Sequence, residues 1–231
     1  MKICAAIPAR LKSTRVPTKL SIKINGKTII QRTVDRVLKS DIKDVYLFTD
    51  SHSLICNGCH NIVNAGQVTE NGTERISKNI DAIPHKYSHV LIVLGDQPLL
   101  NPNHVDYLIR HFGISEDILT LVAPCHDVED RSLAKVVLDK WGKIRHISRQ
   151  PIGFYHHVSL VLIKRDILKN YSAMEKTRVQ TLENNEWIRF LHNGHEMQTF
   201  LIDAPERDLN TPDDLKYIRK KLKKVEMVEC S

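Results

Sequence analysis

A short segment near the N-terminus, residues 7–20 (IPARLKSTRVPTKL), concentrates groups that bind anions. It follows an apolar run and holds two arginines, two lysines, one serine and two threonines in fourteen positions. Guanidinium and ammonium groups pair with phosphate oxygens, hydroxyl and backbone N–H groups donate further hydrogen bonds, and each charge-assisted contact contributes about 1.5 to 3 kcal/mol. The sequence therefore predicts a polyphosphate site, although composition alone also allows a solvated basic loop. The candidate phosphate ligands are Arg10, Ser13, Thr14, Arg15 and Lys19.

The elements that would position this segment alternate along the first half of the chain. Four short runs are almost continuously apolar, as in strands buried on both faces of a parallel sheet: residues 2–7, 45–48, 89–94 and 118–123. Apolar residues three and four positions apart predict helices over residues 28–39, 73–83 and 102–112. This βαβ rhythm predicts an α/β fold, Rossmann-like and doubly wound with a mostly parallel sheet. Residues 8–19 then lie at the ligand-binding edge of that sheet.

The pattern changes after residue 130. Strands are expected around a helical stretch at 179–192, over residues 134–139, 143–147, 157–163 and 197–202. The last helix is predicted to begin at Thr211-Pro212-Asp213-Asp214, a cap, a proline and an acidic first turn in the usual order. We expect one domain over residues 1–231, with a small mixed-sheet lobe embedded at roughly 130–195.

Composition limits the class of protein. The five cysteines are irregularly spaced and the N-terminus lacks the apolar segment of a signal peptide, which indicates the reducing cytoplasm. No apolar run approaches the ~20 residues of a membrane helix, so no membrane partner is expected. The net charge of +7 favours an anionic partner. Nucleic acid is the competing class because of the run RKKLKK, but without interleaved aromatics or zinc spacing this run indicates the solvated face of the last helix.

Two further motifs are weak. Cys56-Asn57-Gly58-Cys59-His60 has the spacing of a haem attachment site and half that of a zinc site, but no export signal or second ligand pair accompanies it. The stretch from Lys23 to Thr28 ends like a P-loop, yet Ser21 stands at the first glycine position. We expect a turn there, before the first helix.

The order of residues in the basic segment is more specific than its charge. PAR-x-x-STR-x-P-x-K, at residues 8–19, is followed by NGK-x-x-I. This signature resembles that of the nucleotide-activating enzymes for acidic sugars, most closely the CMP-Kdo synthetase (3-deoxy-manno-octulosonate cytidylyltransferase) family. The resemblance spans roughly residues 2–220 and includes NGTER at 71–75, GDQPL at 95–99, AKVVLDKWGKIRHISRQPI at 134–152, HVSL at 157–160, EWIRFLHNG at 186–194 and NTPDDL at 210–215.

The resemblance implies transfer of CMP from CTP to the anomeric hydroxyl of a 2-keto sugar acid, with release of pyrophosphate and with Mg²⁺ as cofactor. It implies catalytic roles for Arg10, Arg15, Lys19 and Asp96, and it adds Ala9, Thr73 and Arg75 to the nucleotide site. On the sugar side it implies Lys135, Arg149, His157 and Glu186, although a core position remains open for His157. Members of this family are usually homodimers joined through the second lobe, which implies a homodimer here.

The chain departs from the family pattern at the metal site. Asp96, at the end of the strand at 89–94, matches the first metal ligand, but Asn210 stands where the family has the aspartate of D-T-P. An amide oxygen coordinates Mg²⁺ with one negative charge fewer. Asp208 lies two residues earlier, on the same side of an extended segment, and is a candidate for the missing carboxylate.

Other departures concern the sugar side. Leu94, Val161 and Trp187 replace a glutamine, a tyrosine and a glutamine, and Gln97 replaces the glutamate of GDEP. A site that loses hydrogen bonds to sugar hydroxyls changes or loosens its substrate, so we expect a less hydroxylated, amino-substituted or otherwise modified relative of Kdo. A catalytically weakened, CTP-binding regulatory subunit is the alternative function.

Overall fold

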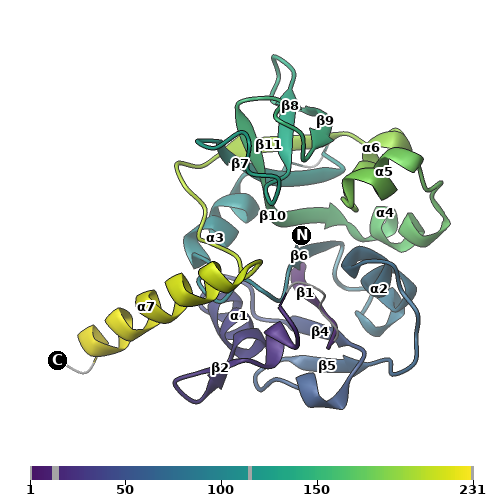
Figure 1. The fold of residues 1–231 in the computed structure, drawn as a ribbon. Helices are drawn as coiled ribbons and strands as arrows, with labels where there is room; N and C mark the ends of the chain where they lie inside the picture. Colours follow the sequence, from purple (N-terminus) through teal and green to yellow (C-terminus); the bar gives the residue numbers. More distant parts are fainter. Residues whose placement is uncertain (1, 12–15, 114–115, 230–231) are drawn as a thin grey trace.

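Nine strands form the main sheet in the computed structural model, which describes residues 2–11, 16–113 and 116–229, with side chains as far as Lys223 (Figure 1). Along its main path the strand order is β11-β7-β10-β6-β1-β4-β5. These strands are β1 (Ile3–Ala9), β4 (Val45–Thr49), β5 (His60–Val63), β6 (His89–Val93), β7 (Ile118–Pro124), β10 (Tyr155–Lys164) and β11 (Met197–Leu201). β1 pairs in parallel with β4 and β6, and β4 with β5, which confirms the mostly parallel, doubly wound core.

Strand β10 connects the two halves of the sheet. It runs antiparallel to β6 on one side and to β7 on the other, with an irregular register between Val158 and Val161. β7 pairs in parallel with β11, while β8 (Lys135–Leu138) pairs with β10 and with β9 (Ile144–Ser148). The strands predicted for the mixed-sheet lobe are thus hydrogen-bonded into the same sheet as the parallel strands.

Helices cover both faces of the sheet. Alternate residues of β1 enter different cores: Ala5 and Ile7 lie in one, and Cys4 and Ala6 in the other. The first core also contains residues of α1 (Ile29–Leu38), α3 (Pro102–Arg110) and α7 (Pro212–Glu229). The second contains residues of α2 (Gly72–Lys78), α4 (Arg165–Asn170) and α6 (Ile188–His192). This division follows from the two-residue period of a strand whose neighbours bury both its faces.

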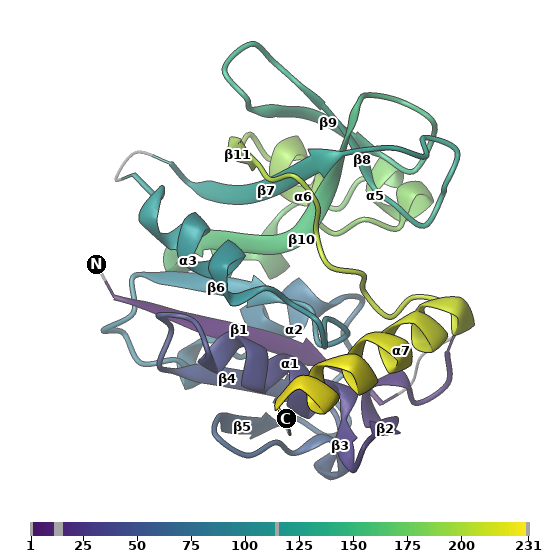
Figure 2. The ribbon, with the colours of Figure 1, turned by 90° about the vertical axis from the view of Figure 1, so that its left-hand side faces the viewer.

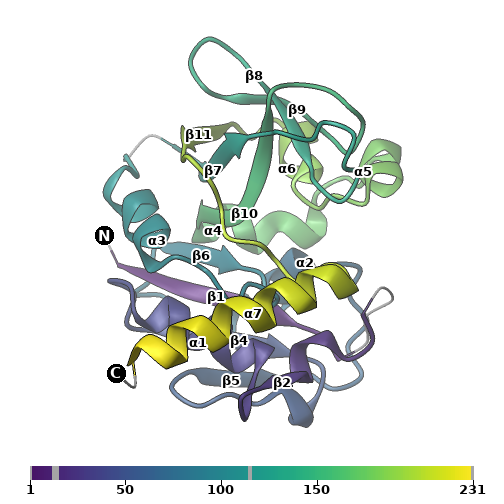
Figure 3. The same ribbon diagram turned by 60° about the vertical axis from the view of Figure 1, so that its left-hand side comes forward.

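Helix α7 begins where the sequence predicts; it shares a core with α1 and crosses β1 obliquely in Figure 3. Ile218 and Leu222 are buried, whereas the basic side chains between and beside them, including Arg219, Lys220 and Lys221, are exposed. In the described part of the chain no helix has the length and apolarity to cross a bilayer.

Some elements were not predicted. The elements not expected from the sequence are β5, α4 and a hairpin of β2 (Lys23–Ile24) and β3 (Lys27–Thr28). The hairpin turn is Asn25-Gly26, both with positive φ, in the place where a turn was expected. The helical stretch at 179–192 is two helices, α5 (Arg178–Glu183) and α6, because Asn184 adopts a left-handed φ of 46°. Short 3₁₀ helices complete the fold: η1 (Lys19–Ser21), η2 (His52–Leu54), η3 (Ile80–Ala82) and η4 (Tyr171–Ala173).

The cysteine pair after η2 has structural surroundings. The Sγ atom of Cys56 lies 3.9 Å from the Leu54 carbonyl oxygen, and that of Cys59 lies 3.7 Å from the Cys56 carbonyl oxygen. Burial raises the pKa of Cys56 to about 12 and that of Cys59 to about 11. Both thiols are therefore protonated at neutral pH, which does not suit a nucleophile.

The segment between β11 and α7 brings a distant part of the chain to the parallel strands. It descends from the upper half of the molecule to the lower half (Figure 2). The Leu209 N–H donates a 2.9 Å hydrogen bond to the Asp96 carbonyl, just beyond the carboxyl end of β6. Asp214 Oδ2 accepts hydrogen bonds from the backbone N–H groups of Asn210 (3.0 Å) and Thr211 (2.7 Å), which fixes the start of α7.

Candidate active site

A cleft of about 560 Å³ lies at the carboxyl ends of the parallel strands, between the two halves of the molecule. This is the edge at which ligands bind in open α/β sheets. Of the predicted site residues, the cleft is lined by Ala9, Arg10, Lys19, Arg75, Asp96, Arg149, His157, Glu186, Asp208 and Asn210. Ser13, Thr14 and Arg15 lie outside the described residues. Thr73 and Lys135 are described but do not line the cleft.

One end of the cleft combines a lysine with two carboxylates. The Lys19 ammonium donates to Asp96 Oδ2 in a short contact, and to the Leu209 carbonyl oxygen at 3.1 Å. Asp96 is only 8% exposed, and within the described residues its Oδ1 atom is buried without a hydrogen-bond partner. A buried carboxylate oxygen left in this state is costly unless a cation or donor completes it.

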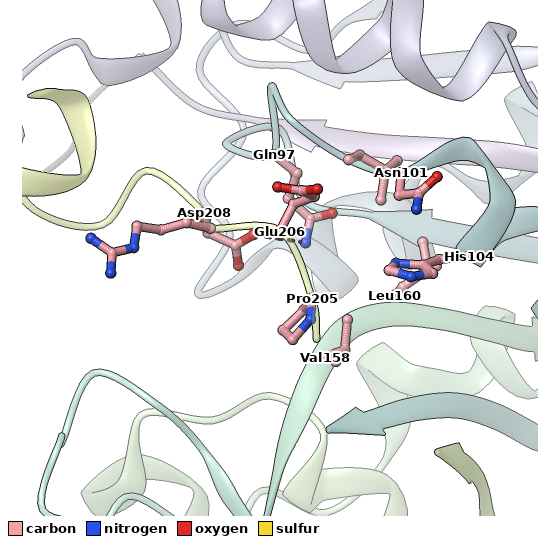
Figure 4. A pocket seen from close by; sticks show the side chains of 10 residues that line it. Gln97, Asn101, His104, Val158, Leu160, Pro205, Glu206 and Asp208 are labelled. Carbon is pink, nitrogen blue, oxygen red and sulfur yellow. Dashed lines mark hydrogen bonds between the residues drawn. The ribbon is translucent and has the colours of Figure 1, made fainter. Parts of the chain in front are cut away.

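Asp208 completes this end of the cleft. Gln97 Nε2 donates a 3.1 Å hydrogen bond to Asp208 Oδ1, and the two side chains lie next to each other (Figure 4). Burial raises the pKa of Asp208 to about 7, and the charge of Asp96 adds to this effect, while Gln97 and Lys19 oppose it. Two carboxyl groups that influence each other in a buried site favour a bound cation.

The donor set fits Mg²⁺. The described residues contain no group of three or more His, Cys, Asp or Glu side chains arranged to hold a metal. Mg²⁺, unlike Zn²⁺, is usually held by one or two carboxylates together with the phosphates of a substrate. Asp96 and Asp208 provide two, and the unpaired Oδ1 of Asp96 is available as a ligand.

A buried arginine faces the cleft from α2. Arg75 is 4% exposed, and its Nη2 atom lies 3.4 Å from Asp50 Oδ2, while Nη1 has no hydrogen-bond partner among the described residues. Burial lowers the pKa of Arg75, the Asp50 carboxylate raises it, and Arg10 lowers it. Asp50 also accepts a 2.9 Å hydrogen bond from the Leu11 N–H, which holds the start of the basic loop. Arg10 and Arg75 thus form a positive region that an anion would neutralise.

Glu186 and Thr73 meet where α2 approaches the end of β1. The Thr73 N–H donates to Glu186 Oε2 at 3.3 Å. Burial raises the pKa of Glu186, while the hydrogen bonds from Thr73 and the charge of Arg10 lower it. A Cβ atom on Gly72 would lie 2.7 Å from Pro8 Cγ, so a glycine is required for this close approach. Thr73 therefore contributes to the site by holding Glu186 through its backbone.

Lys135 and Arg149 bind main-chain carbonyl groups. Lys135 is fully buried, and its ammonium group donates to the carbonyl oxygens of Asp130 and Arg149. The Arg149 guanidinium donates to the carbonyl oxygens of Ser132 (2.5 Å) and Glu183 (3.1 Å). Lys135 thus fixes the wall of the cleft, while Arg149 also lines it.

His157 is a largely buried histidine at the cleft surface. Its Nε2 atom lies 2.9 Å from Thr120 Oγ1, and its ring centroid lies 5.8 Å from that of Trp187. Burial lowers its pKa from 6.5 to about 3. The imidazole is therefore neutral at physiological pH. The sequence left open whether His157 is a core residue or a residue of the sugar side; in the structure it is buried like a core residue and also lines the cleft.

The low pKa of His157 makes stability depend on pH. Between about pH 6.5 and 3 the unfolded chain binds a proton on this side chain that the folded chain does not, so the free energy of unfolding falls as pH falls. This contribution amounts to about 2 kcal/mol between pH 7 and 5. In urea unfolding, we expect the free energy of unfolding of His157→Gln to fall less between pH 7 and 5 than that of the wild type, by about this amount. The exposed His52→Gln is the matched control, and equal acid losses in all three proteins would contradict the prediction.

Comparisons with known proteins show the family of this chain. A family model described as "Cytidylyltransferase" matches residues 4–225. The chain belongs to the cytidylyltransferase family. It is 31% identical to a 3-deoxy-manno-octulosonate cytidylyltransferase of Chloroherpeton thalassium, over 96% of this chain and 100% of that protein. It is 32% identical to the enzyme of the same name of Pelodictyon phaeoclathratiforme, over 95% of this chain and 97% of that protein.

Solved structures show the same cytidylyltransferase fold. A CMP:2-keto-3-deoxy-manno-octonic acid synthetase complexed with CTP superimposes with a TM-score of 0.89, at 24% identity, over 97% of this chain and 99% of that one. A 4-diphosphocytidyl-2C-methyl-D-erythritol synthase of Anaerococcus prevotii superimposes with a TM-score of 0.66, at 13% identity, over 96% and 98% of the two chains. At these identities the likeness concerns the fold.

This cytidylyltransferase also has residues at or beside the cleft that were not expected from its sequence. Asp50 follows β4 directly, so the rule that ligands bind at the carboxyl ends of strands could have found it. Glu70 accepts hydrogen bonds from Lys176 Nζ (2.8 Å) and Arg189 Nη2 (3.1 Å), which come from the other half of the molecule. Both Glu70 and Lys176 line the cleft, and no local pattern in the sequence announces their pairing.

Proposed function

We propose that this protein transfers CMP from CTP to the anomeric hydroxyl of a 2-keto sugar acid, either Kdo or a modified relative of it. The observation that carries the proposal is the cleft in which basic residues of the first loop meet the Asp96 and Asp208 carboxylates. The family match and the names of the relatives support it.

The proposed reaction needs position and charge rather than a nucleophilic side chain. The anomeric oxygen of the sugar forms a bond to the α-phosphorus of CTP, the bond from that phosphorus to the bridging oxygen breaks, and pyrophosphate leaves with the electron pair. The proton of the hydroxyl passes to solvent. Arg10, Lys19 and Arg75 bind the phosphates in this proposal, and Ser13, Thr14 and Arg15 complete the phosphate site.

Mg²⁺ is the proposed cofactor, held by Asp96 together with Asp208 or Asn210. When bound, it would neutralise negative charge on the phosphates. Lys19, which donates to Asp96 and to the Leu209 carbonyl, keeps the segment before α7 against the end of β6. The metal ligands are thereby held together although they lie far apart in the sequence.

The sugar end of the cleft favours an altered acceptor. Leu94 and Trp187 line the cleft and offer no carboxylate or amide to a sugar hydroxyl, while Val161 is buried in β10 and does not line it. Glu186, Arg149 and His157 remain as polar groups on this side. We therefore propose an acceptor with fewer hydroxyl groups than Kdo, or with an amino substituent.

We also propose a cytoplasmic homodimer joined through the second half of the molecule. Large apolar side chains are exposed there, with Trp141 64% and Leu201 53% exposed. Sedimentation equilibrium would test the dimer, and a monomer at micromolar concentration would exclude it.

The test of the function is pyrophosphate release with Mg²⁺, each of the four nucleoside triphosphates, and a panel of Kdo, its amino and deoxy relatives, and sialic-acid-type sugars. Release with CTP and one sugar acid supports the reaction and identifies the acceptor. Efficient use of unmodified Kdo alone would contradict the altered acceptor. Intact CTP binding with no release across the panel would contradict catalysis.

A further inference from the structure

We propose that Gln97 is a positioning residue that holds Asp208 as the second carboxylate for the divalent cation, and that Asn210 is not a metal ligand. This inference rests on the proposed function and names the residues of its metal site. It begins from one observation: Gln97, which replaces the glutamate of the family pattern, donates a hydrogen bond of 3.1 Å to Asp208, 111 residues later in the sequence.

The hydrogen bond explains why an amide stands at position 97. A glutamate there, as in the family pattern GDEP, would place its carboxylate against that of Asp208, and like charges at this distance repel. The Gln97 amide instead donates a hydrogen bond to Asp208 Oδ1, which leaves the other lone pairs of the carboxylate available to a cation. A carboxylate at position 208 and a glutamine at position 97 are therefore compatible as a pair.

The surroundings confine the Gln97 amide. Gln97 is 4% exposed, and the space beside it is a pocket of about 10 Å³ that is also lined by Asn101 and His104 (Figure 4). That volume admits a single water molecule at most. Asp208 lines both this pocket and the main cleft, so the side chain held by Gln97 reaches the cleft surface.

The backbone brings Asp208 to Asp96. The Leu209 N–H donates to the Asp96 carbonyl at 2.9 Å, and Lys19 donates to both the Asp96 side chain and the Leu209 carbonyl. Asp96 is nine-tenths buried, and within the described residues its Oδ1 has no hydrogen-bond partner. Asp96, Asp208 and Asn210 line the same cleft, and the charge of Asp96 acts on Asp208. A second charged oxygen ligand in this cleft suits a hard divalent cation better than the neutral amide of Asn210 does.

The test measures cation binding without turnover. Mn²⁺ is titrated into the protein saturated with CTP, in the absence of any sugar, and the free ion is measured by electron paramagnetic resonance, with CTP alone subtracted. Gln97→Met keeps the side-chain length and removes the amide, and we expect its Mn²⁺ affinity to fall about tenfold. The Mn²⁺ affinity of the isosteric variant Asp208→Asn should fall at least as far, whereas that of Asn210→Ala should match the wild type.

Two combined variants make the test specific. Gln97→Met with Asp208→Asn should bind Mn²⁺ no more weakly than Asp208→Asn alone, because a positioning residue has no effect once its partner is lost. Asn210→Asp added to Asp208→Asn should restore binding, because it returns a carboxylate to the family position. Thermal melting curves would verify that each variant is folded.

The inference is overturned if Asn210→Ala weakens Mn²⁺ binding while Asp208→Asn does not, or if the losses from Gln97→Met and Asp208→Asn add. Failure of the proposed function has a different signature, because the wild type would then release no pyrophosphate with any sugar of the panel, whatever the Mn²⁺ affinities of the wild type and its variants.

Discussion

Asp96→Asn is expected to lower kcat/KM for CTP by about 10³-fold, equivalent to about 4 kcal/mol of transition-state stabilisation. The substitution keeps the shape of the side chain, and its remaining oxygen can still accept from Lys19. What it removes is the negative charge at a buried position where Oδ1 has no partner among the described residues. The loss should therefore fall on cation binding and on the chemistry that depends on it.

Steady-state pyrophosphate release at increasing Mg²⁺ would measure this effect. We expect the Mg²⁺ concentration for half-maximal rate to rise, with part of the activity recovered at high Mg²⁺. Asp203→Asn is the matched control because that aspartate is exposed and does not line the cleft. An unchanged rate and Mg²⁺ requirement in Asp96→Asn would exclude Asp96 as a metal ligand.

Lys19→Gln is expected to lower kcat/KM by about 100-fold, which is typical of removing one preorganised charged donor. Lys19 contacts the Asp96 carboxylate and the Leu209 carbonyl. Its ammonium group therefore offsets the negative charge of the carboxylates and holds the segment before α7 in place. In the proposed reaction it also contacts the phosphates. Unlike that of the Asp96 variant, the activity of this variant should not recover with added Mg²⁺.

The control for Lys19→Gln is Lys27→Gln, whose lysine forms an exposed ion pair with Asp35. The two variants should be compared in initial rates at varied CTP, with KM and kcat separated. Wild-type kinetics in Lys19→Gln would show that its contact with Asp96 serves structure alone.

The predicted site residues that line the cleft at the ends of the parallel strands do so for one physical reason. Arg10, Lys19 and Asp96 follow buried parallel strands, and the carboxyl ends of such strands meet at one edge whatever the tertiary details. The core was predicted from a second rule. The continuous apolar runs of β1 and β6 have no polar face, so both faces of these strands must be buried.

Contacts between distant segments could not be predicted in this way. The family resemblance implied a sugar-binding role for Lys135, yet its ammonium binds carbonyl groups of the chain because the fold brings them around it. The hydrogen bond from Gln97 to Asp208 is equally invisible in sequence. Helix α4 was missed because its six residues are too few to establish a helical period.

The central position of β10 limits where this chain could be split, duplicated or permuted. β10 supplies ladder partners to both β6 and β7. A gene fragment that ended before residue 155 would leave two buried, apolar strands, β6 and β7, with open edges, which are templates for aggregation. Duplication, splitting or permutation of this chain must therefore keep β10 with the strands on both its sides, and a nascent chain leaves these strand edges unpaired until β10 has emerged from the ribosome.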